Sequence, residues 1–233
     1  MVLAAGRGER MRPLTLTTPK PLLPVGGRPL IEWHLRKLAA AGVTDVVVNT
    51  SWLGEQLPRA LGDGQRFGLG LTYSDEGPEP LETAGGIIAA LRWLAPSAGP
   101  VAPFAVVNGD VWTDAPLPPP VPVGSDLVHL VLVDNPPQHP RGDFVLAPAD
   151  SGGRRAVLPR CNRSVAGTFS GLATYWPAFF ADLPPGKRPL KPLLDAGIAA
   201  GRIAGSHWAG RWTDVGTPER LAELAAQLRD GGP

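Results

Sequence analysis

Cysteine is almost missing from this chain of 233 residues, which contains only Cys161. A single cysteine excludes an internal disulfide and any metal site built from several cysteines. The four histidines share no spacing that is typical of a metal site. This composition fits a reducing compartment, and we expect a cytoplasmic protein.

Charge and long apolar runs are also scarce. The chain has 22 Lys and Arg against 21 Asp and Glu, a formal net charge of +1. This balance favours neither nucleic acid nor an anionic membrane as a partner, so any anion site must be local. No segment approaches the roughly 20 apolar residues needed to span a bilayer, and the opening MVLAAGRG contains no basic leader with a long apolar run. We therefore expect no membrane or nucleic-acid partner.

Strand-like and helix-like patterns alternate along the first half of the chain. Apolar runs typical of strands occur at 1–5, 43–50, 69–76 and 104–110, and helical patterns occur at 29–42, 51–61 and 83–94. This alternation predicts an α/β fold with a mixed, mostly parallel central sheet and helices on both faces. After the proline-rich connector 115–125, the second half predicts antiparallel strands and helices at 190–201 and 217–230. We expect one domain over residues 1–233, without internal repeats.

The stretch AAGRGERMRPLTLTTPKPLLPV, residues 4–25, gathers cations beside glycine and proline after the first predicted strand. Ligands of open α/β sheets bind beyond such strand ends, and Gly6 and Gly8 allow backbone N–H groups to approach phosphate closely. The pattern lacks both the third glycine of a dinucleotide fingerprint and the G-K-[ST] ending of a P-loop. By itself it indicates a generic phosphate site or a surface turn. Lys20, held between Pro19 and Pro21, favours a cation with a fixed direction.

Two aspartates, Asp110 in VVNGDVWTD and Asp214 in GRWTDVGTPERL, follow strand-like runs far apart in the sequence. Mg²⁺ binds through one or two carboxylates together with phosphate oxygens and waters, so the two residues could share such a site. Aspartates at strand ends are also common caps and turn formers. Spacing alone leaves both interpretations open.

Taken together, these motifs resemble one enzyme family. LAAGRGERMRPLTLTTPKPLLPVGGRPLIEWHL is similar to the signature of the nucleoside-triphosphate-dependent sugar-1-phosphate nucleotidyltransferases, and NGD and WTDVGTPERL resemble their metal-binding turns. The resemblance implies a Rossmann-like nucleotidyltransferase fold with a nucleotide-binding half, 1–114, and an antiparallel sugar-binding portion plus closing helix, 115–233. It implies Arg12, Lys20 and Asp110 as catalytic residues, Arg10 as a helper, and Asp110 and Asp214 as ligands of Mg²⁺.

The resemblance also implies residues for each substrate. The nucleotide-binding set is Leu3, Ala4, Ala5, Gly6, Gly8, Arg12, Lys20, Leu81, Glu82, Gly85, Asn108 and Gly109. The reaction would be an in-line displacement by a sugar 1-phosphate, whose dianionic phosphate needs no general base.

The acceptor half resembles a short subgroup, the N-acetylmuramate-1-phosphate uridylyltransferases of peptidoglycan recycling. The segments concerned are LVLVDNPPQHPRGDFVLAP, TFSGLATYWPAFF and LKPLLDAGIAAGRIAGSHWAGRWTDVGT. The implied substrates are UTP and a sugar 1-phosphate, with Gly142, Asp143, Ser170 and Gly171 facing the sugar and Lys191 its phosphate. From the residues alone, other interpretations are also open. Asp143 could be a charge at a strand edge, Ser170 and Gly171 could form a tight strand crossing, and Lys191 could be a charge on a helix face.

Other functions also remain open at this stage. The acceptor could be mannose 1-phosphate, glucose 1-phosphate or phosphocholine, or the chain could be a non-catalytic nucleotide-sugar sensor. The missing third glycine disfavours a dinucleotide-dependent oxidoreductase. We expect a monomer or a small homo-oligomer.

Overall fold

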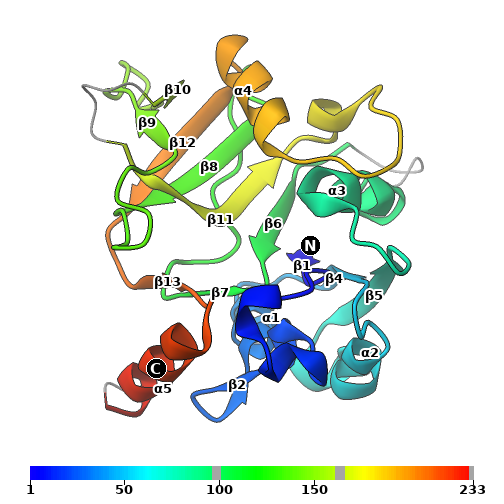
Figure 1. The fold of residues 1–233 in the computed structure, drawn as a ribbon. Helices are drawn as coiled ribbons and strands as arrows, with labels where there is room; N and C mark the ends of the chain where they lie inside the picture. Colours follow the sequence, from blue (N-terminus) through cyan, green and yellow to red (C-terminus); the bar gives the residue numbers. More distant parts are fainter. Residues whose placement is uncertain (96–100, 161–165, 231–233) are drawn as a thin grey trace.

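One mixed sheet of seven strands forms the centre of the structure, a computed structural model that describes residues 1–95, 101–160 and 166–230 (Figure 1). Cys161 lies outside the described residues. The strand order is β12-β8-β11-β6-β1-β4-β5. The strands are β1 (Val2–Leu3), β4 (Asp45–Thr50), β5 (Gly70–Asp75), β6 (Phe104–Asn108), β8 (Val128–Val133), β11 (Thr168–Tyr175) and β12 (Ile203–Trp208). Only β11 runs antiparallel to its neighbours, β6 and β8, which confirms the predicted mostly parallel sheet.

Helices cover both faces of this sheet, as predicted. On one face, α1 (Leu30–Ala40) and α2 (Gln56–Leu61) bury Leu35 and Leu57 against Val48 of β4. On the other face, α3 (Glu82–Leu94) and α4 (Lys191–Ala199) share a second apolar core with Val106 and Leu130. Both cores consist of apolar residues that repeat with helical or strand periodicity. Removing their apolar surface from water lowers the free energy of the folded state.

A third apolar core lies under the N-terminal signature. The closing helix α5 (Pro218–Asp230) contributes Leu224 and Leu228, which pack in one cluster with Met11, Val25 and Val215. Val25 belongs to the small hairpin of β2 (Pro24–Val25) and β3 (Arg28–Pro29). In Figure 1, α5 lies at the opposite end of the molecule from α4. The last helix therefore supports the loop that begins the chain.

Two further strand pairs and five short 3-10 helices complete the fold. Residues 4–25 contain three single-turn 3-10 helices and β2, because short turns fit between closely spaced prolines. The pairs are β7 (Val111–Thr113) with β13 (Trp212–Asp214) and β9 (Phe144–Leu146) with β10 (Val157–Pro159); the 3-10 helices are η1 (Glu9–Met11), η2 (Leu14–Leu16), η3 (Lys20–Leu22), η4 (Gln65–Phe67) and η5 (Pro177–Phe180). Within the described ranges, no helix has both the length and the apolar content required to cross a bilayer.

Candidate active site

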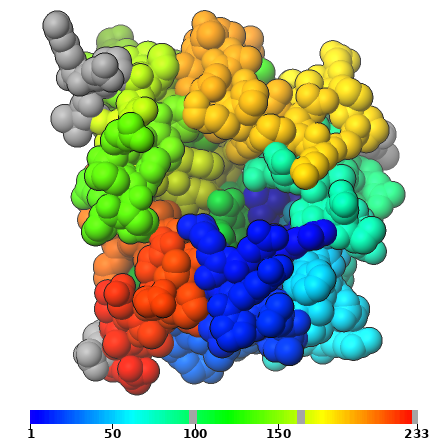
Figure 2. All heavy atoms as spheres, viewed as in Figure 1, coloured from blue at the N-terminus to red at the C-terminus, as the bar shows by residue number. Residues whose placement is uncertain are grey.

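A cavity of about 860 Å³ lies beyond the carboxyl ends of β1 and β6. Figure 2 shows this face hollowed between the N-terminal segment, in blue, and the segment leading to α4, in gold. The structure brings nine of the predicted site residues to the lining of this cleft. They are Leu3, Ala4, Ala5, Gly6, Gly8, Lys20, Glu82, Asn108 and Asp110.

An ion pair between Lys20 and Asp110 marks the chemical centre of the cleft. The Lys20 Nζ donates a hydrogen bond to Asp110 Oδ2 at 2.7 Å, although the two residues lie 90 positions apart. Lys20 is only 7% exposed and begins the single-turn helix η3, with Pro19 before it and Pro21 after it. The Asp110 side chain is 43% exposed and faces the cleft. A buried ammonium held in this way can meet an incoming phosphate with little reorganisation.

The signature loop is shaped by Gly8, which adopts a left-handed conformation with φ +61°. A side chain at this position would come within 2.9 Å of the Thr15 methyl group, while the Thr15 hydroxyl donates to the Gly8 carbonyl at 2.8 Å. This turn presents Arg7 and Arg10 to the cleft lining. Arg12 does not line the cleft; its guanidinium lies 4.0 Å from the Glu9 carboxylate. Of the two arginines weighed from the sequence, the structure thus places Arg10 at the lining of the cleft, whereas Arg12 follows η1 and lies beside Glu9.

Backbone pairing brings the second predicted metal ligand, Asp214, to the same region. In the antiparallel pair β7–β13, Asp214 lies opposite Val111, and the Val215 N–H donates to the Asp110 carbonyl at 2.8 Å. The Asp214 carboxylate accepts hydrogen bonds from Arg220 of α5 and from the Gln138 amide, the latter at 2.6 Å.

The donor set at this place fits Mg²⁺. The described residues hold no cluster of three or more His, Cys, Asp or Glu side chains suited to a metal. Mg²⁺ needs only one or two carboxylates, because phosphate oxygens and waters complete its shell. Asp110, in the turn before β7, and Asp214, the last residue of the paired strand β13, are the residues that could hold it.

A polar network that the sequence analysis missed closes one end of the cleft. The Ala4 N–H donates to Asn49 Oδ1, the Asn49 amide donates to Glu76 Oε1, and the Leu81 N–H donates to Glu76 Oε2, at 2.6, 2.6 and 2.7 Å. Burial raises the pKa of the Glu76 carboxyl above its ordinary value. In the sequence, Asn49 and Glu76 lie at the ends of the strand-like runs 43–50 and 69–76. Polar residues at these two strand ends could have indicated the network.

Gly85 and Gly109, predicted to contact the nucleotide, each make a close contact within the protein. Neither lines the cleft, and neither does Leu81. A side chain on Gly85 would come within 2.5 Å of the Gly186 carbonyl, and one on Gly109 within 2.6 Å of the Leu3 carbonyl. Both glycines therefore allow two parts of the protein's own backbone to approach each other, and their predicted contact with the nucleotide stays a prediction.

The contact at Gly85 also brings a missed cation, Lys187, to the cleft. The N–H groups of Ala84 and Gly85 donate to the Arg188 carbonyl, each at 3.1 Å, and the Arg188 N–H donates to the Leu81 carbonyl at 2.9 Å. Lys187 consequently lines the same cleft as Lys20, with its Nζ 3.9 Å from Glu82. No motif in the sequence distinguished this lysine.

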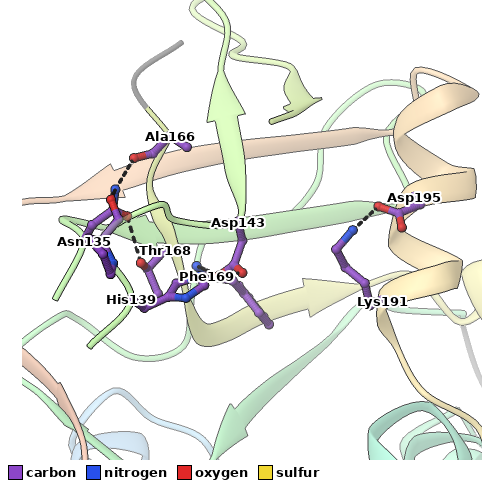
Figure 3. Close-up of polar contacts among 9 residues, drawn as sticks. Asn135, His139, Asp143, Ala166, Thr168, Phe169, Lys191 and Asp195 are labelled. Atoms are coloured by element: carbon purple, nitrogen blue, oxygen red, sulfur yellow. Dashed lines mark hydrogen bonds and ion pairs between the residues drawn. The ribbon is translucent and has the colours of Figure 1, made fainter. Parts of the chain in front are cut away.

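A second cavity, of about 680 Å³, brings together three of the predicted acceptor residues, Gly142, Asp143 and Lys191. The Asp143 carboxylate accepts the Phe169 N–H at 2.8 Å and pairs with His139 at 3.0 Å. From α4, Lys191 donates to Asp195 at 2.6 Å. Figure 3 shows Asp143 and Lys191 on two sides of an open space.

Ser170 and Gly171, predicted to face the sugar, lie outside the lining of this cavity, so that role stays a prediction. Ser170 is fully buried, and its hydroxyl donates to the Val131 carbonyl at 2.7 Å and accepts the Leu172 N–H at 3.2 Å. Gly171 has φ +79°, and a side chain there would come within 2.7 Å of Asn108. Ser170 and Gly171 lie where the pairing of β11 with β8 shifts register. This irregularity corresponds to the tight strand crossing that the sequence also allowed for these two residues.

Comparisons with known proteins agree with this geometry. The chain is 47% identical over 232 residues to the N-acetylmuramate alpha-1-phosphate uridylyltransferase of Neisseria meningitidis serogroup B, covering 97% of this chain and 96% of that protein. It is 35% identical over 247 residues to the protein of the same name from Caulobacter vibrioides, covering 98% and 95%.

The fold also matches a solved structure, a candidate glucose-1-phosphate thymidylyltransferase from Bacillus anthracis. The TM-score is 0.77 at 21% identity, over 98% of this chain and 94% of that one. Residues 1–154, which include the signature loop and Asp110, match the Nucleotidyl transferase family. The chain therefore belongs to the nucleotidyl transferase family.

Proposed function

We propose that the chain transfers a uridylyl group from UTP to N-acetylmuramate 1-phosphate, giving UDP-N-acetylmuramate and pyrophosphate. The observation that carries the proposal is the 47% identity to the Neisseria meningitidis uridylyltransferase, which extends through the acceptor half as well as the signature half. The Lys20–Asp110 pair in the cleft supports the same chemistry. The product would serve the recycling of peptidoglycan in the cytoplasm, with the enzyme acting as a monomer or small homo-oligomer.

The main obstacle in this reaction is charge repulsion between two phosphate groups. The acceptor phosphate is already a nucleophile, so the protein must align it with the α-phosphate and neutralise charge. Lys20 supplies a fixed ammonium for the α-phosphate. Arg7, Arg10 and the N–H groups of the Gly6–Gly8 turn hold the β- and γ-phosphates, which depart as pyrophosphate.

Asp110 and Asp214 would hold a Mg²⁺ ion, which when bound neutralises phosphate charge beside Lys20. Lys20 and Asp110 then act as one unit, because the aspartate accepts a hydrogen bond from the ammonium and so orients it. In this proposal residues 1–114 bind the nucleotide. Residues 115–233 bind the acceptor and add the closing helix, with Gly142 and Asp143 beside the sugar and Lys191 beside its phosphate.

The deciding experiment measures pyrophosphate release for a matrix of nucleoside triphosphates and acceptors. The acceptors are N-acetylmuramate 1-phosphate, mannose 1-phosphate, glucose 1-phosphate and phosphocholine, each with and without Mg²⁺. We expect UTP with N-acetylmuramate 1-phosphate to give the highest kcat/KM, and only with the metal. A preference for another pair would reassign the acceptor, and release with none would favour a non-catalytic sensor.

A further inference from the structure

The second cavity is lined by more cationic side chains than form ion pairs with its carboxylates. Its carboxylates are Asp143, which pairs with His139, and Asp195, which pairs with Lys191. Arg141 and Arg160 also line the cavity, and among the described residues no carboxylate forms an ion pair with Arg141, which unlike Arg160 belongs to the turn that includes Gly142. An exposed guanidinium beside satisfied carboxylates is suited to an incoming anion, which it can bind through two parallel hydrogen bonds.

The turn that carries Arg141 is rigid. The His139 N–H donates to the Pro136 carbonyl at 2.8 Å, and the Gly142 N–H donates to the His139 carbonyl at 3.1 Å. Gly142 has φ +60°, and a side chain on it would come within 2.5 Å of Asn135 Oδ1. This backbone conformation is available to glycine at little cost, so the residue after Arg141 fixes the direction in which the chain leaves the turn.

Asn135 anchors the start of this turn to the sheet. Its amide donates to the Ala166 carbonyl at 2.8 Å, and its Oδ1 accepts the Thr168 hydroxyl at 2.8 Å, as Figure 3 shows. At the other end of the turn, Asp143 accepts the Phe169 N–H. A guanidinium on a turn anchored at both ends loses less freedom when it binds a ligand than one on a loose loop.

The same turn reaches the chemical centre. Gln138, three residues before Arg141, lines the second cavity and donates to the Asp214 carboxylate at 2.6 Å. The side of the turn near Gln138 therefore adjoins the place where the acceptor phosphate must react. Arg141 lies farther along the same turn in this cavity, where the groups of the sugar remote from its phosphate would be.

We propose that Arg141 binds the lactyl carboxylate of N-acetylmuramate 1-phosphate and so selects it over N-acetylglucosamine 1-phosphate. The two acceptors differ only in the lactyl ether on O3 of the sugar, which adds one carboxylate. Arg141 is thus a specificity-determining residue rather than part of the phosphate chemistry. This inference rests on the proposed function.

The test compares the two acceptors in wild-type protein and in Arg141→Gln, with Arg141→Lys and Arg59→Gln as controls. Arg59 is an exposed arginine on α2, away from both cavities. We expect Arg141→Gln to lower kcat/KM for N-acetylmuramate 1-phosphate about 10- to 100-fold, the value of one charge-assisted contact. The loss should appear mainly in KM, while the kcat/KM for N-acetylglucosamine 1-phosphate stays within about twofold of wild type.

Arg141→Lys should recover part of the loss, since it retains charge without the bidentate geometry. Arg59→Gln should behave as wild type with both acceptors. Equal losses with both acceptors would overturn the inference, and so would an unchanged KM for N-acetylmuramate 1-phosphate. If wild-type protein does not turn over N-acetylmuramate 1-phosphate, the proposed function fails as well, and that failure is visible before any variant is made.

Discussion

His34 should make the stability of this protein depend on pH. The side chain lies on α1, is 1% exposed, and its Nε2–H donates to the Val111 carbonyl at 2.8 Å. Its Nδ1 is buried without a hydrogen-bond partner among the described residues, so a second proton would have no acceptor. Burial lowers the pKa of His34 from 6.5 to about 4.

The direction of the effect follows from where the proton binds. Between pH 6.5 and 4 the unfolded chain binds a proton at His34, whereas the folded protein does not. The free energy of unfolding therefore falls as the pH falls. A pKa difference of about 2.5 units is worth about 3 kcal/mol in full, of which about 2 kcal/mol is lost by pH 5.

The contribution of His34 to this pH dependence can be isolated by urea unfolding of the wild-type protein and of His34→Gln, each at pH 7.5 and pH 5. Glutamine can still donate to the Val111 carbonyl, but it does not titrate. We expect the wild-type protein to lose about 2 kcal/mol more than the variant over this interval. Parallel losses in the two proteins would refute the assignment of a depressed pKa to His34.

Three further predictions concern residues of the predicted site. Lys20→Ala should lower kcat about 100- to 1000-fold in the pyrophosphate assay while circular dichroism shows an intact fold, and an unaltered kcat would remove the lysine from the mechanism. Asp110→Asn and Asp214→Asn should each abolish the Mg²⁺-dependent turnover, so full activity in either would contradict a metal site there. Ser170→Ala should cost about 1–3 kcal/mol in urea unfolding, because the Val131 carbonyl and the Leu172 N–H lose their partner. Its KM for the acceptor should stay at the wild-type value; a raised KM with unchanged stability would restore Ser170 to the sugar site.

The central sheet could be predicted from the sequence because its strands and helices are defined by local periodicity. The β-branched run of β4 and the spacing of Leu30 and Leu38 in α1 each indicate their structure without reference to any other part of the chain. The cleft could be located for a related reason. Loops that follow parallel strands gather at one edge of a sheet, whichever residues they contain.

The roles of individual site residues depended on contacts between distant segments. Gly85 is needed because residue 186 approaches it, about a hundred positions later, and nothing near Gly85 in the sequence reports that approach. Lys187 reaches the cleft through the same contact. The choice between Arg10 and Arg12 depends on the exact turn of η1, which a pattern of residue types does not encode.

The position of α5 has a consequence for the order in which the enzyme is assembled. Leu224 and Leu228 of α5 share an apolar core with Met11 and Val25, which both belong to the N-terminal stretch 4–25. A ribosome releases the signature long before it releases this helix. Until Leu224 and Leu228 have been synthesised, the apolar surface around Met11 and Val25 therefore stays uncovered in the nascent chain.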